Sequence, residues 1–568
     1  MALSDFIITD DLTVVLGLVA ICLFLLHNLY KPQSLVHPIL LGRQSDVARV
    51  RNPRESATYR NYSTGMMGRF PARPTKDQHC ILDLVRPDAD APRTLWSTKI
   101  TNPELRERVS SFANGLVRYA GLVPQESNVL LLLNDSIEFI ISDLALASAS
   151  LPSFLLTSLR LLSPLLESHP PTAIVTHADM LPSLLEVIYD SHESGHHTII
   201  VVGNFDNSVA ASVGHVRLLR WESVEREGAQ GDKLILPDLH PQDIFSVSFF
   251  EGLSGELEGT QLTHENLTAG VASVRALLPL SSAMSPLDTL ISAFPLNTPY
   301  GRAVAYTAIY EGTSFATLDS TKLISSGGAA ATALADLASA NSFPIPSPTI
   351  LFIKPSHLNS LSSEIIDKAK ASSPLLYHLG WRHKLSGILE GFITKRSLWD
   401  RLVFDSARVN VMDKGAGTVR GVIVGGEPLE AQTLVLCRIA LSVPLVNAYI
   451  HPLVTGPVFA SHPLDLQTFP SAVSSSSSAA DAYTFSYLAP VGPPSVNVEV
   501  KLRGVDDSAV EAGADPCGAL FAAGPVVGTL LRLQDNQDEY ELGWVELGER
   551  AKVATNGTFK VVEDKGRK

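Results

Sequence analysis

Short runs of consecutive apolar residues alternate with amphipathic segments along most of the chain. Residues 129–133 form one such run and predict a buried parallel strand, and Ile137–Ser148 predicts the helix that follows. Upstream, Thr101 and Glu104 form a capping box that opens an amphipathic helix. Together these patterns predict a doubly wound α/β fold. Further strands are predicted at residues 173–175, 198–202, 244–249, 349–353 and 422–424.

The pattern changes near the C-terminus, where short strand-like segments predict a smaller β-rich lobe. Its strands are expected at residues 496–502, 518–523 and 530–532. Just before the lobe, residues 471–480 are mostly serine and alanine, which predicts a flexible surface insertion.

One long apolar segment near the N-terminus begins at Leu12 and ends at Tyr30. It contains no charged residue if His27 is neutral, and a helix of this length spans about 28 Å, close to a bilayer core. Acidic residues precede it and basic residues follow it, so a membrane anchor with the body in the cytosol is expected. A cleaved signal peptide and a buried core helix are the competing interpretations.

Composition narrows the classes of partner. The 568 residues are 45% hydrophobic and 18% charged, which favours a large globular body. The formal net charge of −14 disfavours nucleic acid as a partner, because phosphate backbones bind basic surfaces. The four cysteines lie far apart and lack the spacing of a metal or redox site.

Candidate chemistry gathers in residues 249–266, where Gly252, Gly255 and Gly259 recur closely enough for backbone amides to converge on an anion. An ordinary tight turn is the competing interpretation. The loop contains neither Lys nor Arg, and it carries three carboxylates, Glu251, Glu256 and Glu258. At an effective dielectric constant of about 20, each carboxylate about 5 Å from a phosphate charge opposes phosphate binding by roughly 3 kcal/mol.

This loop resembles the phosphate loop of the adenylate-forming (AMP-binding) superfamily, approximately YTSGTTGxPKGVxLTHxN. In that register Ser254 falls on a phosphate-binding hydroxyl, Glu258 replaces the lysine, and Thr263 and His264 belong to the LTH element. Residues 295–302, PLNTPYGR, resemble the family's PLxHxxxR element with Thr298 in place of His.

Later segments resemble long-chain fatty acid–CoA ligases (acyl-CoA synthetases) in the same order. Residues 402–404 and 422–429 resemble LVFxK and GGAPL, which implies that Gly425, Gly426 and Glu427 surround an adenine. Residues 448–453 fall on GYGLTE, so Tyr449 would stack on the adenine and Leu453 replaces the magnesium-binding Glu.

The resemblance continues to the C-terminus. Residues 543–549 resemble GWxxTGD, with Glu549 in place of a ribose-binding Asp, and residues 556–565 resemble the family's hinge, with Asp564 in place of Arg. The chain ends at Lys568, where the family continues into a lid domain that carries a catalytic lysine. We therefore expect that lid to be absent.

The resemblance implies the fold of the large N-terminal domain of adenylate-forming enzymes, with doubly wound sheets and a small β-rich lobe, preceded by one transmembrane helix. The expected parts are an anchor at 1–31, a linker and lead-in at 32–90, an AMP-binding-like body at 91–485, the lobe at 486–562 and a hinge remnant at 563–568.

The lost cations, the lost magnesium ligand and the expected absence of a lid predict a catalytically impaired, membrane-anchored relative that binds an acyl chain or a protein partner. An active ligase using ATP, Mg²⁺ and CoA and a structural membrane scaffold are the alternatives. The resemblance implies the endoplasmic reticulum or the peroxisomal membrane. We expect no cofactor, no catalytic residue and no metal ligand, and a vestigial nucleotide site of Gly252, Ser254, Gly255, Gly259, Thr263, Gly425, Gly426, Glu427, Tyr449 and Glu549.

Several of these residues also have structural interpretations. His264 at a helix start is typically structural, and Tyr449 is equally compatible with a core position. Glu427 lies on an expected turn, where solvent exposure is the simpler reading. The three loop carboxylates are more often solvated than a cation site.

Overall fold

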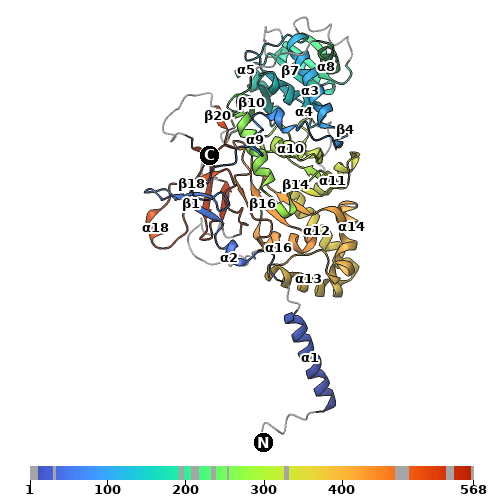
Figure 1. Ribbon diagram of the computed structural model, residues 1–568, viewed down its shortest axis with the longest axis vertical. Coiled ribbons are helices and arrows are strands. Elements are labelled where there is room, and N and C mark those ends of the chain that lie inside the picture. The colour runs from blue at the N-terminus through green and yellow to red at the C-terminus, as the bar shows by residue number, and fades with distance from the viewer. Residues whose placement is uncertain are drawn as a thin grey trace.

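The computed structural model describes residues 10–29, 33–190, 197–205, 216–231, 238–252, 255–324, 332–466, 485, 487–531 and 543–563. Tyr30, Ser254, Asp564 and the serine-rich segment 471–480 lie outside these ranges. Within them, the strands form two eight-stranded sheets and one six-stranded sheet (Figure 1).

The first large sheet lies in the upper part of the body in Figure 1. Its strand order is β20-β11-β10-β6-β5-β7-β8-β9, and the pairs from β10 to β9 are parallel. This confirms the predicted parallel strands, whose apolar runs are buried between helices. The strands are β5 (Val129–Leu132), β6 (Ser153–Leu156), β7 (Ala173–His177), β8 (His197–Val202), β9 (Val216–Arg220), β10 (Ile244–Glu251), β11 (Leu257–Thr263) and β20 (Thr529–Leu531).

The second large sheet has the order β17-β16-β15-β14-β12-β13-β3-β4 and is parallel from β16 to β3. Helices alternate with these strands along the chain, as expected for a doubly wound fold. The strands are β3 (Arg93–Leu95), β4 (Thr98–Ile100), β12 (Thr289–Ser292), β13 (Ser314–Thr317), β14 (Ile350–Ile353), β15 (Gly421–Val424), β16 (Leu445–Tyr449) and β17 (Phe459–Ala460).

The six-stranded sheet is the expected β-rich lobe, with the order β1-β2-β18-β19-β21-β22. Two of its strands come from the segment that we expected to be a linker and lead-in, because β1 and β2 pair with the lobe. Conversely, the strand expected at 530–532 does not join the lobe: β20 pairs with β11 of the first large sheet. The lobe strands are β1 (Ser45–Arg49), β2 (Thr58–Asn61), β18 (Glu499–Arg503), β19 (Cys517–Ala523), β21 (Val545–Val553) and β22 (Phe559–Glu563).

Helices cover both large sheets. The predicted helix Ile137–Ser148 is α4, and the predicted capping box of Thr101 and Glu104 opens α3. The helices are α1 (Asp11–Leu29), α2 (Pro38–Leu41), α3 (Asn102–Arg118), α4, α5 (Leu162–Ser168), α6 (Leu181–Asp190), α8 (Trp221–Gln230), α9 (His264–Arg275), α10 (Pro299–Glu311), α11 (Ala333–Ser339), α12 (Pro355–Ser372), α13 (Pro374–Leu389), the π-helical turn η8 (Asp400–Phe404), α14 (Asp405–Met412), α15 (Gly415–Thr418), α16 (Ala431–Leu441) and α18 (Asp507–Glu511).

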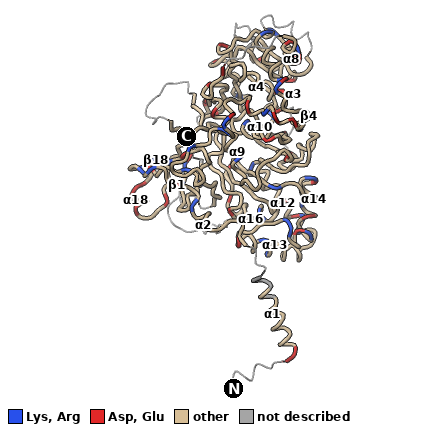
Figure 2. The backbone as a smooth tube through the Cα atoms, viewed as in Figure 1, with Lys and Arg blue, Asp and Glu red and all other residues tan. Residues whose placement is uncertain are grey.

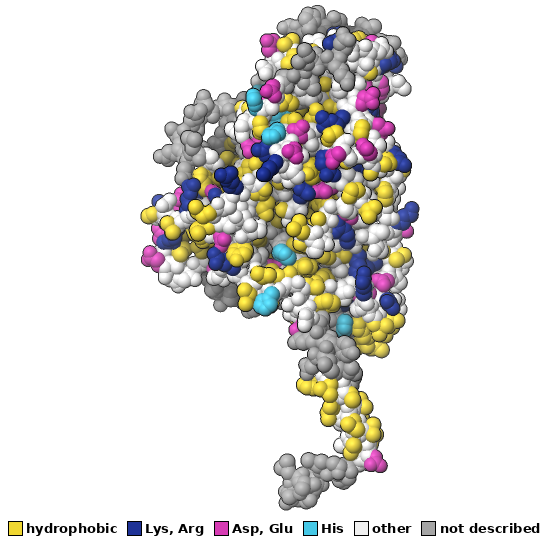
Figure 3. Space-filling view, viewed as in Figure 1, with side chains coloured by type: hydrophobic (Ala, Val, Ile, Leu, Met, Phe, Trp, Pro, Cys, Tyr) yellow, Lys and Arg dark blue, Asp and Glu magenta, His cyan; other side chains and the backbone are white. Residues whose placement is uncertain are grey.

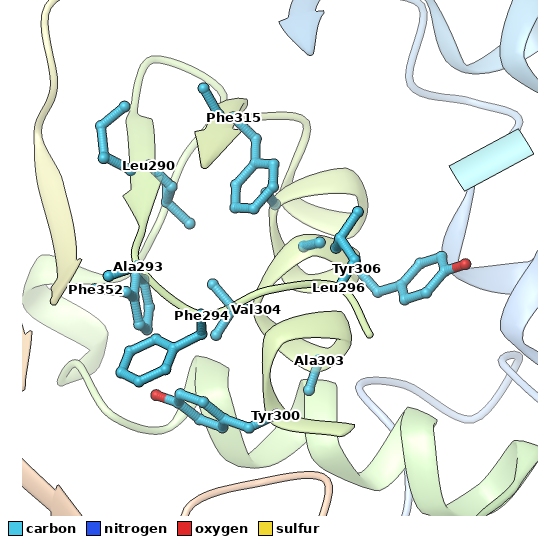
Figure 4. Close-up of a cluster of buried hydrophobic side chains, with 14 of the residues drawn as sticks. Leu290, Ala293, Phe294, Leu296, Tyr300, Ala303, Val304, Tyr306, Phe315 and Phe352 are labelled. Atoms are coloured by element: carbon cyan, nitrogen blue, oxygen red, sulfur yellow. The ribbon is translucent and has the colours of Figure 1, made fainter. Parts of the chain in front are cut away.

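A single buried hydrophobic cluster joins the two large sheets through α4, α9 and α10. Figure 4 shows its central part, where side chains of β12, β13 and β14 face α10. Phe294 and Tyr300 meet there edge to face with ring centroids 5.0 Å apart (Figure 4). This packing fixes α10 between the sheets and thereby the strand ends that lead to the candidate site.

Helix α1 extends away from the folded body in Figure 1, and the apolar side chains described on it, from Leu12 to Leu25, are exposed. The expected membrane span, from Leu12 to Tyr30, falls largely on this helix. Within the described part of the chain, however, no helix combines the length and apolarity required of a membrane span.

Candidate functional site

A cavity of about 450 Å³ lies where both large sheets meet the lobe. Its walls come from the carboxyl ends of β10, β15 and β16, from β11 and β20, and from β21 and β22 of the lobe. Ligands of open α/β sheets bind at the carboxyl ends of the strands, and the volume is within the usual range of small-molecule sites. This cavity is therefore the candidate functional site.

Two described amides of the loop between β10 and β11 donate hydrogen bonds within the loop. The Gly252 N–H donates to the Glu256 carbonyl (2.8 Å), and the Gly255 N–H donates to the Gly252 carbonyl (3.0 Å). Gly255 has a φ of 82°, a conformation that favours glycine. Glu258 lies against Gly252, where an added Cβ would come within 2.7 Å of the Glu258 Cδ. The amides of Gly252 and Gly255 therefore bond to the loop rather than converge on an anion.

Gly425 and Gly426 follow β15 and allow the chain after it to approach β16. A Cβ on Gly425 would lie 2.9 Å from the carbonyl oxygen of Ala448, and Gly426 has a φ of 91°. Gly426, Glu427 and Tyr449 line the cavity. Glu427 is exposed, in agreement with the simpler interpretation of this position.

Carboxylates dominate the polar part of the cavity wall. Among the described residues, none of those that line it is Lys or Arg. The excess of negative charge disfavours any phosphate in this cavity. The carboxylates belong to Glu251, Glu258, Glu427, Glu546 and Glu549.

His451 lines the cavity beside Glu549. Its Nε2 is 3.9 Å from the Glu549 Oε1, and its Nδ1 accepts a hydrogen bond from the Leu453 N–H (3.2 Å). Burial lowers the pKa of His451 to about 4. The ring is therefore neutral at pH 7 and supplies no positive charge against the glutamates.

Leu453, where the resemblance expects a magnesium ligand, is buried. It belongs to a hydrophobic cluster that includes Phe250 and Phe459. The described residues contain no group of three or more His, Cys, Asp or Glu side chains that could hold a metal ion.

Thr263 and Thr298 belong to motifs that carry the resemblance, but both are helix caps. The Thr263 hydroxyl accepts the Asn266 N–H (3.2 Å) at the start of α9, and the Thr298 hydroxyl accepts the Gly301 N–H (3.1 Å) at the start of α10. Such caps satisfy backbone donors that a helix leaves unpaired. Neither threonine is among the residues that line the cavity.

His264 is a structural residue, as the simpler interpretation held. Its ring stacks on Phe245 with centroids 5.2 Å apart, and its Nδ1 accepts the Ile81 N–H (3.4 Å). Burial lowers the pKa of His264 to about 4. The ring is thus neutral at pH 7 and contributes no charge to the cavity.

Arg302 also lies away from the cavity, fully buried between α10 and the first large sheet. Its guanidinium donates to the hydroxyls of Ser246 and Ser248 (2.9 Å each) and lies 3.5 Å from the Asp143 carboxylate. The Tyr306 hydroxyl donates to the same carboxylate (2.7 Å). Arg302 is therefore part of a compensated structural network rather than a ligand-binding cation.

A nucleoside triphosphate with Mg²⁺ does not fit the residues present. The amides of Gly252 and Gly255 are bonded within the loop, no cation lines the described cavity, and a buried leucine occupies the position of the magnesium ligand. A triphosphate needs donors and cations at these positions.

The structure brings five of the ten expected site residues to one cavity: Gly252, Gly426, Glu427, Tyr449 and Glu549. Gly425 is adjacent to it, whereas Gly259 packs on β10 and Thr263 caps α9. Gly255 lies in the hairpin loop but does not line the cavity, and Ser254 is outside the described residues.

Sequence reasoning did not select Glu546 or His451 for this site. Both stand within segments that carried the resemblance, and the signal for Glu546 was its position three residues before Glu549 in the same motif. Their approach to the cavity depends on how β21 and the end of β16 pack together.

Comparison with known proteins identifies the fold and the family. Residues 85–529 match the AMP-binding enzyme family. The peroxisomal long chain acyl-CoA synthetase 6 of Arabidopsis thaliana is 24% identical over 539 residues, which cover 88% of this chain and 68% of that protein. The chain covers 37% and 53% of the length of two other curated relatives.

Solved structures share the fold at low sequence identity. The anthranilate CoA ligase AuaEII, in complex with anthranoyl-AMP, has a TM-score of 0.61 and 16% identity, covering 86% of this chain and 79% of that one. A long-chain-fatty-acid-CoA ligase from Archaeoglobus fulgidus has a TM-score of 0.57 and 14% identity, covering 87% of this chain and 84% of that one.

Proposed function

This chain belongs to the AMP-binding enzyme family, and on that premise we propose that it is a non-catalytic relative of the long-chain acyl-CoA synthetases that binds an acyl chain in the inherited cavity. The observation that carries the proposal is the set of five glutamates on the described cavity wall, without a lysine or arginine among them. Repulsion of roughly 3 kcal/mol for each nearby carboxylate opposes nucleotide binding.

The rest of the cavity wall supports an apolar ligand. Apolar side chains bury a hydrocarbon chain favourably, at about 0.8 kcal/mol per methylene group. The glutamates repel the carboxylate of a free fatty acid, so an uncharged acyl group suits the cavity better. The apolar lining includes Phe250, Ile450, Leu453, Val491, Leu530, Leu547 and Val561.

The first test is nucleotide binding and turnover by the full chain in lipid nanodiscs. We expect no binding heat on titration with ATP and Mg²⁺, and no pyrophosphate release when palmitate and CoA are added. Pyrophosphate release that depends on palmitate would overturn the proposal and make the chain an active ligase.

The second test compares a fluorescent fatty acid with its methyl ester. The ester should bind more tightly than the fatty acid. Leu530→Glu adds charge to the cavity wall and should weaken binding of the ester. Leu287→Glu, at a side chain that is 91% exposed, is the matched control and should leave binding unchanged. If neither lipid binds, the acyl role fails, and a role in binding a protein partner or as a membrane scaffold replaces it.

We also propose that α1 attaches the protein to a membrane, with the body on the cytosolic side of the endoplasmic reticulum or the peroxisome. Figure 2 draws α1 without Lys or Arg and with an acidic residue only in its first turn. The side chains of Leu16, Val19 and Phe24 on this helix are exposed in the folded chain. Such a helix buries its apolar surface favourably in lipid.

A further inference from the structure

We propose that the outer face of α13 is a second lipid-contact site, which docks the body onto a bilayer surface that bears anionic lipids. The face is defined by Leu375, Leu379, Arg382 and Leu389 and is called the α13 face below. The inference rests on the proposed membrane attachment of α1, and the experiment below separates failure of one from failure of the other.

The α13 face exposes three leucines beside Arg382 and Ser386, on a side of the helix that is normally polar. At 3.6 residues per turn, its four positions fall within roughly 80° of one another on the helix. Leu375, Leu379 and Leu389 are 72%, 44% and 64% exposed. The opposite side of α13 buries Gly380, Lys384 and Ile388, so the helix is already packed against the body on that side. An exposed row of leucines on a helix that is already packed indicates a further contact.

The inner side of α13 is fixed, so the face does not reach water by rotation of the helix. Lys384 points inward and donates to the Asp400 carboxylate (2.5 Å), the Thr394 carbonyl (2.6 Å) and the Ser442 hydroxyl (3.0 Å). A buried ammonium group with three acceptors is costly to expose. The leucines of the α13 face are therefore held outward.

Residues 34 and 35, shortly after α1 in sequence, lie at the end of α13. The Leu35 N–H donates to the carbonyl of Gly391, two residues beyond the helix (3.0 Å). A Cβ on Gly391 would lie 3.0 Å from the Cβ of Ser34, which confirms the close approach. A bilayer that holds α1 thus lies near α13, and Figure 3 shows hydrophobic side chains gathered at this end of the body.

The charges of α13 and the segment that follows it are complementary to anionic lipids. Residues 374–405 contain five basic side chains, of which Arg382, Arg396 and Arg401 are exposed, against three carboxylates, Glu390, Asp400 and Asp405. This local excess of positive charge contrasts with the formal net charge of −14 of the whole chain. A basic residue near an anionic bilayer contributes about 1 kcal/mol of attraction.

The test places an environment-sensitive nitrobenzoxadiazole dye on one cysteine at a time in the full chain. Cys22 is exposed on α1 and reports that helix. Leu379→Cys in a Cys22→Ser background reports the α13 face, and Val123→Cys, at a side chain that is 47% exposed, is the matched control. The Cys22→Ser chain without an added cysteine corrects for dye on the partly exposed Cys80 and Cys517.

With phosphatidylcholine vesicles that contain phosphatidylserine, dyes at positions 22 and 379 should both shift to the blue and be quenched by brominated lipids, and the dye at 123 should not. If only the dye at 22 responds, the α13 proposal is wrong and attachment by α1 stands. If only the dye at 379 responds, attachment by α1 is wrong. If neither responds, both are wrong.

A double variant tests the energetics without a dye. Leu375→Glu with Leu379→Glu should weaken vesicle partitioning at least about tenfold, since burial of one leucine is worth more than that. Its thermal midpoint should be unchanged because both side chains are exposed. If the double variant instead dissociates an oligomer and vesicle partitioning is unaffected, a second copy of the chain covers this face and the lipid proposal is overturned.

Discussion

Strand β10 meets charged side chains at two places, one in the core and one at the cavity. In its buried part, Ser246 and Ser248 accept hydrogen bonds from Arg302, which is paired with Asp143. At its carboxyl end, Glu251 enters a cavity whose described wall carries five glutamates and no basic side chain. A charge in the core must be compensated, whereas a charge at an open cavity is hydrated. The acidic cavity therefore constrains which ligand binds far more than it affects folding.

The largest expected effect comes from reversing one cavity charge. Glu258→Lys should give measurable ATP binding to a chain that we propose does not bind ATP. Removal of one repulsion and gain of one attraction, about 5 Å from a phosphate at an effective dielectric constant of about 20, amount to roughly 6 kcal/mol. Calorimetric titration with ATP and Mg²⁺ measures the change.

The control for this variant lies in the same loop. Glu256→Lys makes the same charge change at an exposed side chain that does not line the cavity. It should gain much less affinity. Equal gains would mean that net charge, rather than the cavity wall, excludes the nucleotide.

The next largest effect should come from removing Arg302, the cation that is buried against β10. Arg302→Met leaves the Asp143 carboxylate buried without its cationic partner and should lower the free energy of unfolding by about 3–5 kcal/mol. Urea denaturation measures the loss. Adding Asp143→Asn should recover part of it.

An exposed arginine supplies the control for Arg302. The side chain of Arg226 is 64% exposed, and Arg226→Met should change stability by less than about 0.5 kcal/mol. A small effect of Arg302→Met would show that the buried network does not depend on its charge.

A smaller loss of folding stability should appear on acidification. The buried His451 has a pKa of about 4, below its usual value of about 6.5. The unfolded chain therefore takes up this proton first. The stability from neutral His451 is complete above pH 6.5 and is lost as the pH falls towards 4, with about 2 kcal/mol lost at pH 5.

Comparison of urea midpoints at pH 7 and pH 5 tests this linkage. His451→Gln should remove about 2 kcal/mol of the difference between the two pH values. His378→Gln, at an exposed position, should leave the difference unchanged. An unaltered pH dependence in His451→Gln would mean that other groups set the acid sensitivity.

The smallest effect separates a helix cap from a ligand contact. Thr298→Ala should cost about 1 kcal/mol of stability, because it removes the acceptor for the Gly301 N–H. Thr298→Ser keeps that acceptor and should retain most of the stability. A change in acyl binding with unchanged stability would assign Thr298 to the ligand instead.

Local sequence signals predicted the secondary structure of the body well. Helix α4 has the predicted bounds, and the capping box of Thr101 and Glu104 opens α3 as predicted. Caps and apolar runs depend on neighbouring residues, so they can be recognised without the fold. The partners of β2 and β20 depend on contacts across hundreds of residues and could not be recognised in this way.

The candidate site was likewise predicted in part from the sequence, and the rest depended on the fold. The sequence showed that Glu251 and Glu258 lie in a glycine-rich loop without cations. The resemblance also placed Glu549 of the lobe in this site, whereas only the structure brought Glu546 to the same cavity. The structure also showed that Arg302, a cation within a family motif, is committed to Asp143 and the serines of β10.

The sequence by itself determined the alternation of strands and helices, the resemblance to the AMP-binding enzymes and the sign of the charge in the loop, since each depends on residue type and short spacing. The tertiary structure decided which charges are compensated, which glycine amides are already bonded and which leucines of α13 face outward. These depend on distances between segments remote in sequence, and the burial that sets the energy of a charge exists only once the chain has folded.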